Sequence, residues 1–203
     1  MHLMRADELA VTPLQAARSL LGCVIESSIS DTRVGVRLVE VEAYWGAKDP
    51  ASHSYRGRTA RNAVMFGPAG RLYVYFVYGM HFCVNVVCLT DGDPGAVLLR
   101  AGEVRYGLDA AKSRRAAART DSELAKGPAR LTSALGLTRE HNGVDLTDPD
   151  SPVRLLRDEA VGDDQVCTGP RVGVAAAKDT PWRYWIAGSP AVSVYRRGGK
   201  RSS

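Results

Sequence analysis

The sequence predicts an α+β fold made of one domain. Its 203 residues suffice for one substantial core, and 45% apolar with 24% charged residues is an ordinary globular composition. Short runs of β-branched and aromatic residues, separated by turns of Gly, Pro and Asp, indicate antiparallel strands. Other stretches, rich in Leu or Ala, have the spacing of helices. We therefore expect an antiparallel sheet with surrounding helices.

An N-terminal helix is expected to lead into a pair of strands. Thr12 and Pro13 are typical of an N-cap and a first helical residue, and Gly22 is typical of a helix end. Strands are then predicted at residues 23–25 and 34–44. Because the residues between them favour a turn, the two strands should pair in antiparallel orientation.

The second of these strands carries two carboxylates. By the period of two, Glu40 and Glu42 continue the apolar face that begins at Val34, if no bulge intervenes. A buried carboxylate is costly, so it usually pairs with a cation or works in a site. The two glutamates are therefore the strongest candidates for a general base, with ion pairs to Arg37 or Arg100 as the structural alternative.

A long loop and a β-meander are expected in the middle of the chain. Residues 46–71 contain few aliphatic side chains and several Gly, Pro and Arg residues, which is typical of an ordered loop with a functional role. His53 in this loop could hydrogen-bond to the edge of a base, although a lone loop histidine is more often a cap or a surface residue. The strands of the meander are predicted at residues 71–78, 82–88 and 96–101.

The second half of the chain predicts two helices and two late strands. An Ala-rich helix with interspersed Arg is expected at residues 102–120, and a second helix at 122–135 is interrupted or entered at Gly127-Pro128. Residues 145–164 are acidic and rich in turn-forming residues. The expected late strands are 171–175 and 182–186.

Clustering of the basic residues favours a polyanionic partner. Lys and Arg number 27 against 22 acidic residues. The acids gather at residues 145–164, so the charge is separated into basic and acidic regions, as in proteins that dock on phosphates. For any single cluster, a solvated helix face or a disordered tail is the alternative. The basic clusters are residues 54–71, 105–119 and a tail at 196–203 that should be disordered, so that the domain spans 1–195.

The cysteines and the N-terminus favour a cytoplasmic protein. The four cysteines show no paired framework, as expected in a reducing compartment. The first residues lack the apolar core of a signal peptide, and no apolar run approaches the roughly 20 residues of a membrane span. We expect no membrane association, and association with the nucleoid if the protein is bacterial.

The sequence lacks the motifs typical of several kinds of metal, nucleotide and hydrolase sites. Neither C-x-x-C nor H-E-x-x-H occurs, so no metal site is expected. The phosphate loops G-x-x-x-x-G-K and G-x-G-x-x-G are also missing, and so is the G-x-S-x-G elbow of serine hydrolases. We therefore expect no ATP, NAD or other cofactor.

Tyrosines are dense around one predicted turn. Tyr73, Tyr75 and Tyr78 precede Gly79, and such a density of hydroxylated rings suggests surfaces that bind flat rings such as nucleobases. Tyr78 at the tip of the hairpin would be exposed, as suits a side chain that inserts between stacked bases. Asn85 on the returning strand is either a satisfied amide of the sheet or the wall of a pocket.

Short motifs follow one another along most of the chain. They are VEVEAYWG at 39–46, SHS at 52–54, RNAVMF at 61–66, YVY at 73–75, YGM at 78–80, CVN at 83–85, VLLRA at 97–101, GP at 127–128 and RVGV at 171–174. In these motifs and in their order, from about residue 10 to Val194, the chain resembles the alkyladenine (3-methyladenine) DNA glycosylase family.

The resemblance implies a monofunctional DNA glycosylase of base-excision repair. Such an enzyme flips an alkylated or deaminated purine out of duplex DNA and hydrolyses its N-glycosidic bond with an activated water. The implied substrates are of the 3-methyladenine, 7-methylguanine, hypoxanthine and ethenoadenine class. Double-stranded DNA with a damaged purine would be the partner, and the enzyme is expected to act as a monomer.

The resemblance also implies a role for individual residues. Glu42 matches the general base that activates the water, and Arg100 matches a residue that helps to hold it. Asn85 matches the residue that clashes with the 2-amino group of guanine. The residues implied to contact the flipped base are Tyr44, His53, Tyr75, Asn85 and Val172, and those implied to enter or flank the vacated stack are Tyr78, Met80 and His81.

Two alternatives to a monofunctional glycosylase remain open. The resemblance implies a curved antiparallel sheet, similar to the C-terminal domain of methionyl-tRNA formyltransferase, and a non-catalytic nucleic-acid-binding module could use the same fold. A bifunctional glycosylase would instead have lyase activity through a lysine such as Lys48. At His81 several family members carry an aromatic residue, so the neighbour of the wedge is more polar here.

Overall fold

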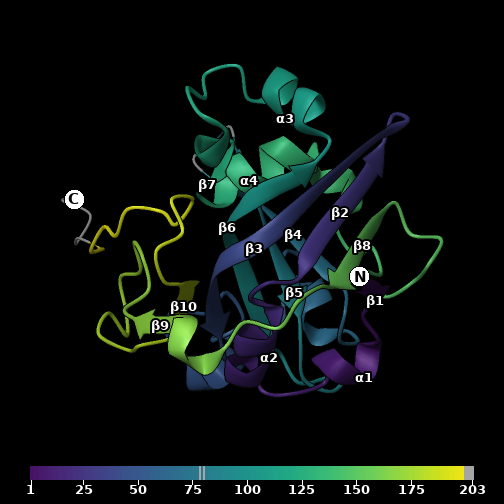
Figure 1. Cartoon of the computed structure of the whole chain (residues 1–203). Coiled ribbons are helices and arrows are strands. Elements are labelled where there is room, and N and C mark those ends of the chain that lie inside the picture. Colours follow the sequence, from purple (N-terminus) through teal and green to yellow (C-terminus); the bar gives the residue numbers. More distant parts are fainter. Residues whose placement is uncertain (78, 80, 199–203) are drawn as a thin grey trace.

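A curved antiparallel sheet organises the chain in the computed structural model (Figure 1). The structure describes residues 1–77, 79 and 81–198. Within them the helices are α1 (Ala6–Leu9), α2 (Pro13–Leu20), α3 (Leu108–Arg114) and α4 (Pro128–Leu135). The strands are β1 (His2–Leu3), β2 (Val24–Ile29), β3 (Thr32–Tyr44), β4 (Leu72–Val77), β5 (His81–Val87), β6 (Ala96–Tyr106), β7 (Ala125–Lys126), β8 (Val153–Arg157), β9 (Val166–Gly169) and β10 (Arg183–Ile186).

These strands form one sheet whose order departs from that of the chain. The order is β1-β8-β2-β3-β6-β5-β4, while β10 pairs with both β3 and β9, and β7 pairs with β6. In Figure 1, α3 and α4 gather at one end of the sheet, and α1 and α2 lie at the other. The helices and the sheet share one apolar core, so the predicted α+β fold around a curved antiparallel sheet is confirmed.

Several local predictions are confirmed by this arrangement. The Thr12 hydroxyl accepts a hydrogen bond of 3.3 Å from the backbone N–H of Gln15, which caps α2 as the Thr-Pro pair suggested. Strands β2 and β3 form the expected antiparallel pair, and β4, β5 and β6 form the expected meander. The late strand expected near residue 182 is β10.

The prediction that Glu40 and Glu42 share the apolar face of Val34 on β3 is wrong. The pairing of β3 with β6 shifts in register between Leu38 and Glu40, so the irregularity that the prediction assumed absent is present. The core residues of β3 are even-numbered up to Leu38 and odd-numbered from Val39 onward. Glu40 and Glu42 therefore alternate with the core residues instead of continuing the apolar face of Val34.

Three other predictions of local structure are wrong, and one of two alternatives for the second helix is confirmed. Residues 102–106 belong to β6, where the missing side chain of Gly102 lets β3 approach, since an added Cβ would lie 2.3 Å from a Val36 methyl carbon. For the second helix, the alternative of an entry at Gly127-Pro128 is confirmed, because α4 begins at Pro128 and residues 125–126 pair with β6 as β7. Strand β8 lies within the acidic stretch and pairs with β1 and β2. No strand is present at 171–175, and β9 just before it pairs with β10 instead.

All four cysteines are free, and burial raises the pKa of the Cys88 thiol to about 12. Of the helices in the described residues, none has the length and apolar character needed to cross a membrane.

Ser27 joins the sheet to α4, and its removal should weaken the fold. Its buried hydroxyl donates a hydrogen bond of 2.7 Å to the carbonyl of Leu135 at the end of α4. We expect Ser27→Ala to lower the free energy of unfolding by about 1–2 kcal/mol, because a buried carbonyl loses its donor. Urea denaturation measures this change. Ser28→Ala, on the exposed neighbour, is the control, and equal effects of the two variants would contradict the assignment.

Candidate active site

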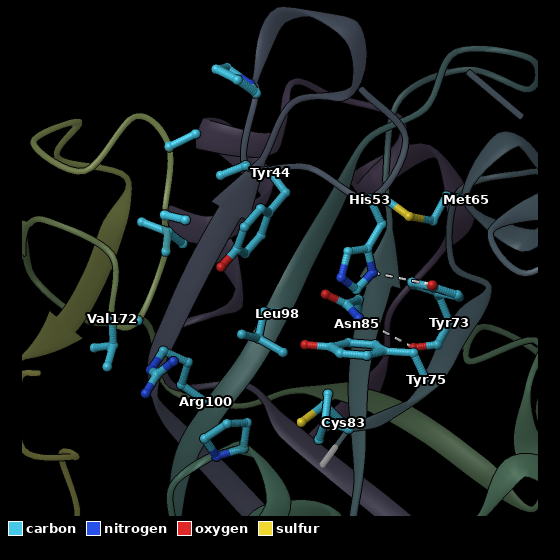
Figure 2. A pocket seen from close by; sticks show the side chains of 18 residues that line it. Tyr44, His53, Met65, Tyr73, Tyr75, Cys83, Asn85, Leu98, Arg100 and Val172 are labelled. Carbon is cyan, nitrogen blue, oxygen red and sulfur yellow. Dashed lines mark hydrogen bonds between the residues drawn. The ribbon is translucent and has the colours of Figure 1, made fainter. Parts of the chain in front are cut away.

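A pocket of about 420 Å³ opens over strands β3, β4, β5 and β6 (Figure 2). The loop at residues 50–53 and the loop at residues 172–176 close it on the sides where the sheet does not. Its walls are mostly aromatic and aliphatic, with a few polar groups that converge on the interior, as in sites that bind small flat ligands. The pocket is therefore the candidate active site.

The register of the sheet brings one row of side chains to the pocket. Glu42 of β3 pairs with Leu98 of β6, Leu98 pairs with Asn85 of β5, and Asn85 pairs with Tyr73 of β4. Residues that are direct partners in neighbouring strands point to the same face. Four separate strands thus place a carboxylate, an aliphatic side chain, an amide and an aromatic ring in line across the sheet.

Aromatic rings form opposite walls of the pocket. Figure 2 shows Tyr44 on one side, and His53 with Tyr75 on the other. The rings of His53 and Tyr75 meet edge to face with centroids 4.6 Å apart, and Tyr75 stacks on Tyr73 at 5.6 Å. His53 Nδ1 also lies 3.3 Å from the Tyr73 hydroxyl, within hydrogen-bond distance. The two walls leave a slot suited to a flat ring between them.

Asn85 lies at the back of this slot. Its amide nitrogen donates a hydrogen bond of 3.4 Å to the carbonyl of Tyr73, which fixes the orientation of the side chain. The side chain is buried and belongs to the lining of the pocket. Of the two sequence alternatives for Asn85, a satisfied amide and a pocket wall, both hold at once.

Glu42 is buried at the edge of the pocket and held by three donors. Its Oε1 accepts a hydrogen bond of 2.7 Å from the backbone N–H of Val172 and lies 3.4 Å from a guanidinium nitrogen of Arg100. Its Oε2 accepts one of 2.7 Å from the hydroxyl of Tyr44. Tyr44, Arg100 and Val172 all line the pocket, so each of these neighbours of the carboxylate also faces the pocket.

Glu40 has different surroundings, although it lies only two residues away on the same strand. Both of its oxygens accept hydrogen bonds from Ser193, and Oε1 also accepts from the Nε of Arg183 at 2.7 Å and the Nε of Arg100 at 3.2 Å. Glu40 is fully buried and is not part of the pocket lining. Its contacts are those of a structural carboxylate that anchors β10 and the C-terminal segment to β3.

Arg100 lies between the two carboxylates. Burial alone would lower the pKa of its guanidinium, but the charges of Glu42 and Glu40 raise that pKa overall, so Arg100 stays cationic. The predicted ion pair with Arg100 thus exists, whereas Arg37 pairs with Glu103 at 3.9 Å and not with either glutamate.

A second buried ion pair lies behind the Tyr44 wall. Arg171 donates to both oxygens of Asp49, at 2.5 and 2.8 Å, and to the carbonyl of Ala43 at 2.9 Å. Its guanidinium carbon lies 4.6 Å from the ring centre of Tyr44 and 5.2 Å from that of Trp182. Arg171 therefore connects the loop that carries His53 with the strand that carries Tyr44.

Burial also sets the protonation of the pocket walls. It raises the pKa of Tyr44 well above its usual range, and the neighbouring charge of Glu42 adds to the shift. Burial raises the pKa of Tyr75 in the same way. For His53, burial and then the charge of Arg61 lower the pKa, so the imidazole is neutral at pH 7. The walls are therefore uncharged, whereas Glu42 and Arg100 bring charge to the edge of the slot.

The structure brings most of the predicted site residues together. Among the residues expected at the site, His81 is exposed at the start of β5 and lies outside this pocket, on a second cavity of about 360 Å³. Tyr78 and Met80, which the resemblance implies at the wedge, lie outside the described residues. The predicted residues that line the pocket are Tyr44, His53, Tyr75, Asn85, Arg100 and Val172, with Glu42 directly behind them.

Asp49 and Arg171 were not singled out as functional residues from the sequence. Each belongs to a stretch that drew attention, the loop at 46–71 and the RVGV motif, but nothing local connects two residues 122 positions apart. Within the described residues, no group of three or more His, Cys, Asp or Glu side chains is arranged to hold a metal ion.

Comparison with known proteins agrees with the geometry of the pocket. The family model described as Methylpurine-DNA glycosylase (MPG) matches residues 7–190. A relative from Nocardia farcinica named "Putative 3-methyladenine DNA glycosylase" is 54% identical over 202 residues, which cover 97% of this chain and 93% of the relative. A relative of the same name from Streptomyces avermitilis is 52% identical, and the match covers 90% of this chain and 87% of the relative. One from Mycobacterium tuberculosis is 48% identical, and the match covers 97% of this chain and 96% of the relative.

The buried histidine should make stability depend on pH. The folded-state pKa of His53 lies below its ordinary value of 6.5, so the unfolded chain binds a proton first as the pH falls. The stability that neutral His53 contributes is complete above that ordinary value and is lost progressively below it. We expect His53→Gln to lose less stability than the wild type between about pH 8 and about pH 5, measured by thermal unfolding. His2→Gln, at an exposed histidine, should lose as much stability as the wild type over this pH range. If both variants lost as much stability as the wild type, His53 would not be the source of the pH dependence.

Proposed function

This chain belongs to the methylpurine-DNA glycosylase family, and from that membership we propose that it is a monofunctional DNA-3-methyladenine glycosylase of base-excision repair. It flips alkylated or deaminated purines out of duplex DNA and hydrolyses the N-glycosidic bond, which leaves an abasic site. The observation that carries the proposal is the slot between Tyr44 and the His53–Tyr75 wall, with Glu42 beside it.

The walls of the slot suit damaged purines. A purine alkylated at N3 or N7 is cationic, and the neutral faces of Tyr44 and Tyr75 attract a cation by about 0.5–2 kcal/mol. The same alkylation makes the base a better leaving group. A pocket of about 420 Å³ accommodates several purine lesions, which supports a substrate class rather than one substrate. We propose that this class includes 3-methyladenine, 7-methylguanine, hypoxanthine and ethenoadenine.

Glu42 is proposed as the general base. A water held between Glu42 and Arg100 attacks the anomeric carbon of the sugar while the carboxylate takes a proton from it. The electrons of the breaking N-glycosidic bond leave with the purine, and a cationic purine thereby departs neutral. Glu42 Oε1 already contacts two donors and Oε2 only the Tyr44 hydroxyl, so Oε2 is the oxygen with room for the proton.

Glu40 is proposed to support this arrangement without joining the chemistry. Arg183, Ser193 and Arg100 occupy the oxygens of Glu40. Glu40 thereby holds the Nε of Arg100, while another guanidinium nitrogen of Arg100 faces Glu42. Val172 positions Glu42 through its backbone N–H and also lines the pocket, so a role beside the flipped base fits its place.

The wedge role of Tyr78, with Met80 and His81 beside it, stays part of the proposal. It rests on the family motif YGM, since Tyr78 and Met80 lie outside the described residues. His81 and Phe82 begin the returning strand of the same hairpin, on the side of α4. A side chain that fills the vacated stack offsets the few kcal/mol that base flipping costs.

The two alternatives explain less of the pocket. A non-catalytic module, similar in fold to the C-terminal domain of methionyl-tRNA formyltransferase, would have no use for a buried carboxylate beside an aromatic slot. A lyase would need an amine in the pocket, but the ammonium of Lys48 lies over the ring of Trp45 at 4.8 Å and is not among the lining groups. Borohydride should therefore trap no covalent adduct with DNA.

Replacement of the general base tests the mechanism. Glu42→Gln should release base from a hypoxanthine or 3-methyladenine duplex at least about 100-fold more slowly than wild type, because an amide accepts no proton from the water. Binding to the same duplex should remain. Base release is measured as abasic-site formation in single-turnover reactions. Glu140→Gln, on an exposed glutamate away from the pocket, is the control, and undiminished release by Glu42→Gln would remove Glu42 from this role.

Asn85 is expected to set the preference between purines. If its side chain clashes with the 2-amino group of guanine, Asn85→Ala should raise the release of 7-methylguanine relative to hypoxanthine, which has no such group, by about tenfold. Parallel assays on the two duplexes give this ratio. Asn142→Ala, outside the pocket, should leave the ratio unchanged. An unchanged ratio in Asn85→Ala would assign selectivity to other residues.

A further inference from the structure

The C-terminal segment leaves the core beside the pocket. Ser193 is tied to Glu40 through its backbone N–H at 2.7 Å and through its hydroxyl at 2.9 Å. The next two residues turn outward, with Val194 71% and Tyr195 41% exposed. The chain thus passes from the carboxylate network to the surface within a few residues.

The segment then returns to the rim of the pocket. The backbone N–H of Gly173 donates a hydrogen bond of 3.0 Å to the carbonyl of Arg196. Gly198 packs so closely on this loop that an added Cβ would lie 2.0 Å from the carbonyl oxygen of Val174. Gly173 and Val174 both line the pocket, so residues 196–198 are fixed at its mouth.

Two arginine side chains at this position are available to a ligand. Arg196 is exposed and forms no ion pair with the described residues. Arg197 pairs with Asp179 at 3.1 Å, and both of these side chains are largely exposed. An exposed pair of this kind contributes little and exchanges readily for another anion.

We propose that Arg196 and Arg197 bind backbone phosphates of the DNA strand that carries the flipped nucleotide. The inference rests on the proposed function, because a flipped base in the pocket leaves the phosphates of its own nucleotide at the mouth. Cations fixed there neutralise phosphates and release the counterions condensed on them, which adds affinity without reading sequence. Residues 196–198, the part of the basic tail that the structure describes, thereby have a defined place beside the pocket, where the sequence predicted disorder.

Substitution of the two arginines tests the proposal. The variants are Arg196→Gln and Arg197→Gln, and the control is Arg5→Gln. Arg5 is also exposed and also pairs with an exposed aspartate, Asp7, at 2.9 Å. It directly precedes α1, which Figure 1 shows on the side of the sheet away from the C-terminal segment. Affinity for duplex DNA, with and without a lesion, is measured by fluorescence anisotropy over a range of salt concentrations.

Each phosphate contact has a measurable signature. Each of the two variants should bind both duplexes about threefold to tenfold more weakly and reduce the slope of log affinity against log salt by about 0.9. Arg5→Gln should match the wild type in affinity, slope and base release. Variants that match Arg5→Gln in affinity and salt slope would overturn the proposal.

The proposed function is judged by a separate readout. Single-turnover base release by the wild type decides whether the protein is a glycosylase, whereas the salt slope on undamaged duplex decides whether the arginines contact phosphates. A wild type that released no base would refute the proposed function, and the salt slopes would still accept or reject the phosphate contacts by themselves.

Discussion

The geometry of the pocket depends on the buried ion pair between Arg171 and Asp49. Both side chains are fully excluded from water, which is costly for two charges unless their hydrogen bonds are nearly all made. Here the two bonds to Asp49, the bond to the Ala43 carbonyl and the ring of Tyr44 offset that cost, and only the Nε of Arg171 has no partner. Removal of one partner from such a pair costs about 3–5 kcal/mol, because the other charge stays buried. The loop with His53, the end of β3 and the segment with Val172 are therefore held as one unit, and the width of the slot follows from it.

Strand β3 shows how neighbouring residues of one type acquire different tasks. Glu40 and Glu42 alternate with the core residues and both contact Arg100. Glu40 is enclosed by Arg183 and Ser193, so it joins β3 to β10 and to the C-terminal segment. Glu42 is held by groups that line the pocket, and for this reason we propose it, and not Glu40, as the general base. The difference lies in their partners and not in the residue type.

Local signals predicted the parts of the fold that short-range physics decides. Thr12 and Pro13 begin α2 because a hydroxyl cap and a fixed φ favour that start wherever the helix packs. Alternation and turns predicted the meander, since a hairpin needs only neighbouring residues. By contrast, β8 lies in a stretch whose sequence indicates acidic turns, and residues 102–106, which begin the segment predicted to be an Ala-rich helix, instead extend β6. Both are strands because distant strands offer them hydrogen bonds and a buried face, and this long-range pairing overrides weak local propensity.

The sequence by itself determined the one-domain α+β class, the dense tyrosines of the hairpin, the separated charge and, through its motifs, the family resemblance. The spacing of residues could not show which of Glu40 and Glu42 is the general base. Only the match to the family motif favoured Glu42 for this role. The tertiary structure decided which groups surround each carboxylate, the register that aligns Glu42 with Leu98 and Asn85, and the pairing of Arg171 with an aspartate 122 residues away. These depend on which segments meet and exclude water, and the free energy of such contacts comes from burial and long-range geometry that no local pattern encodes.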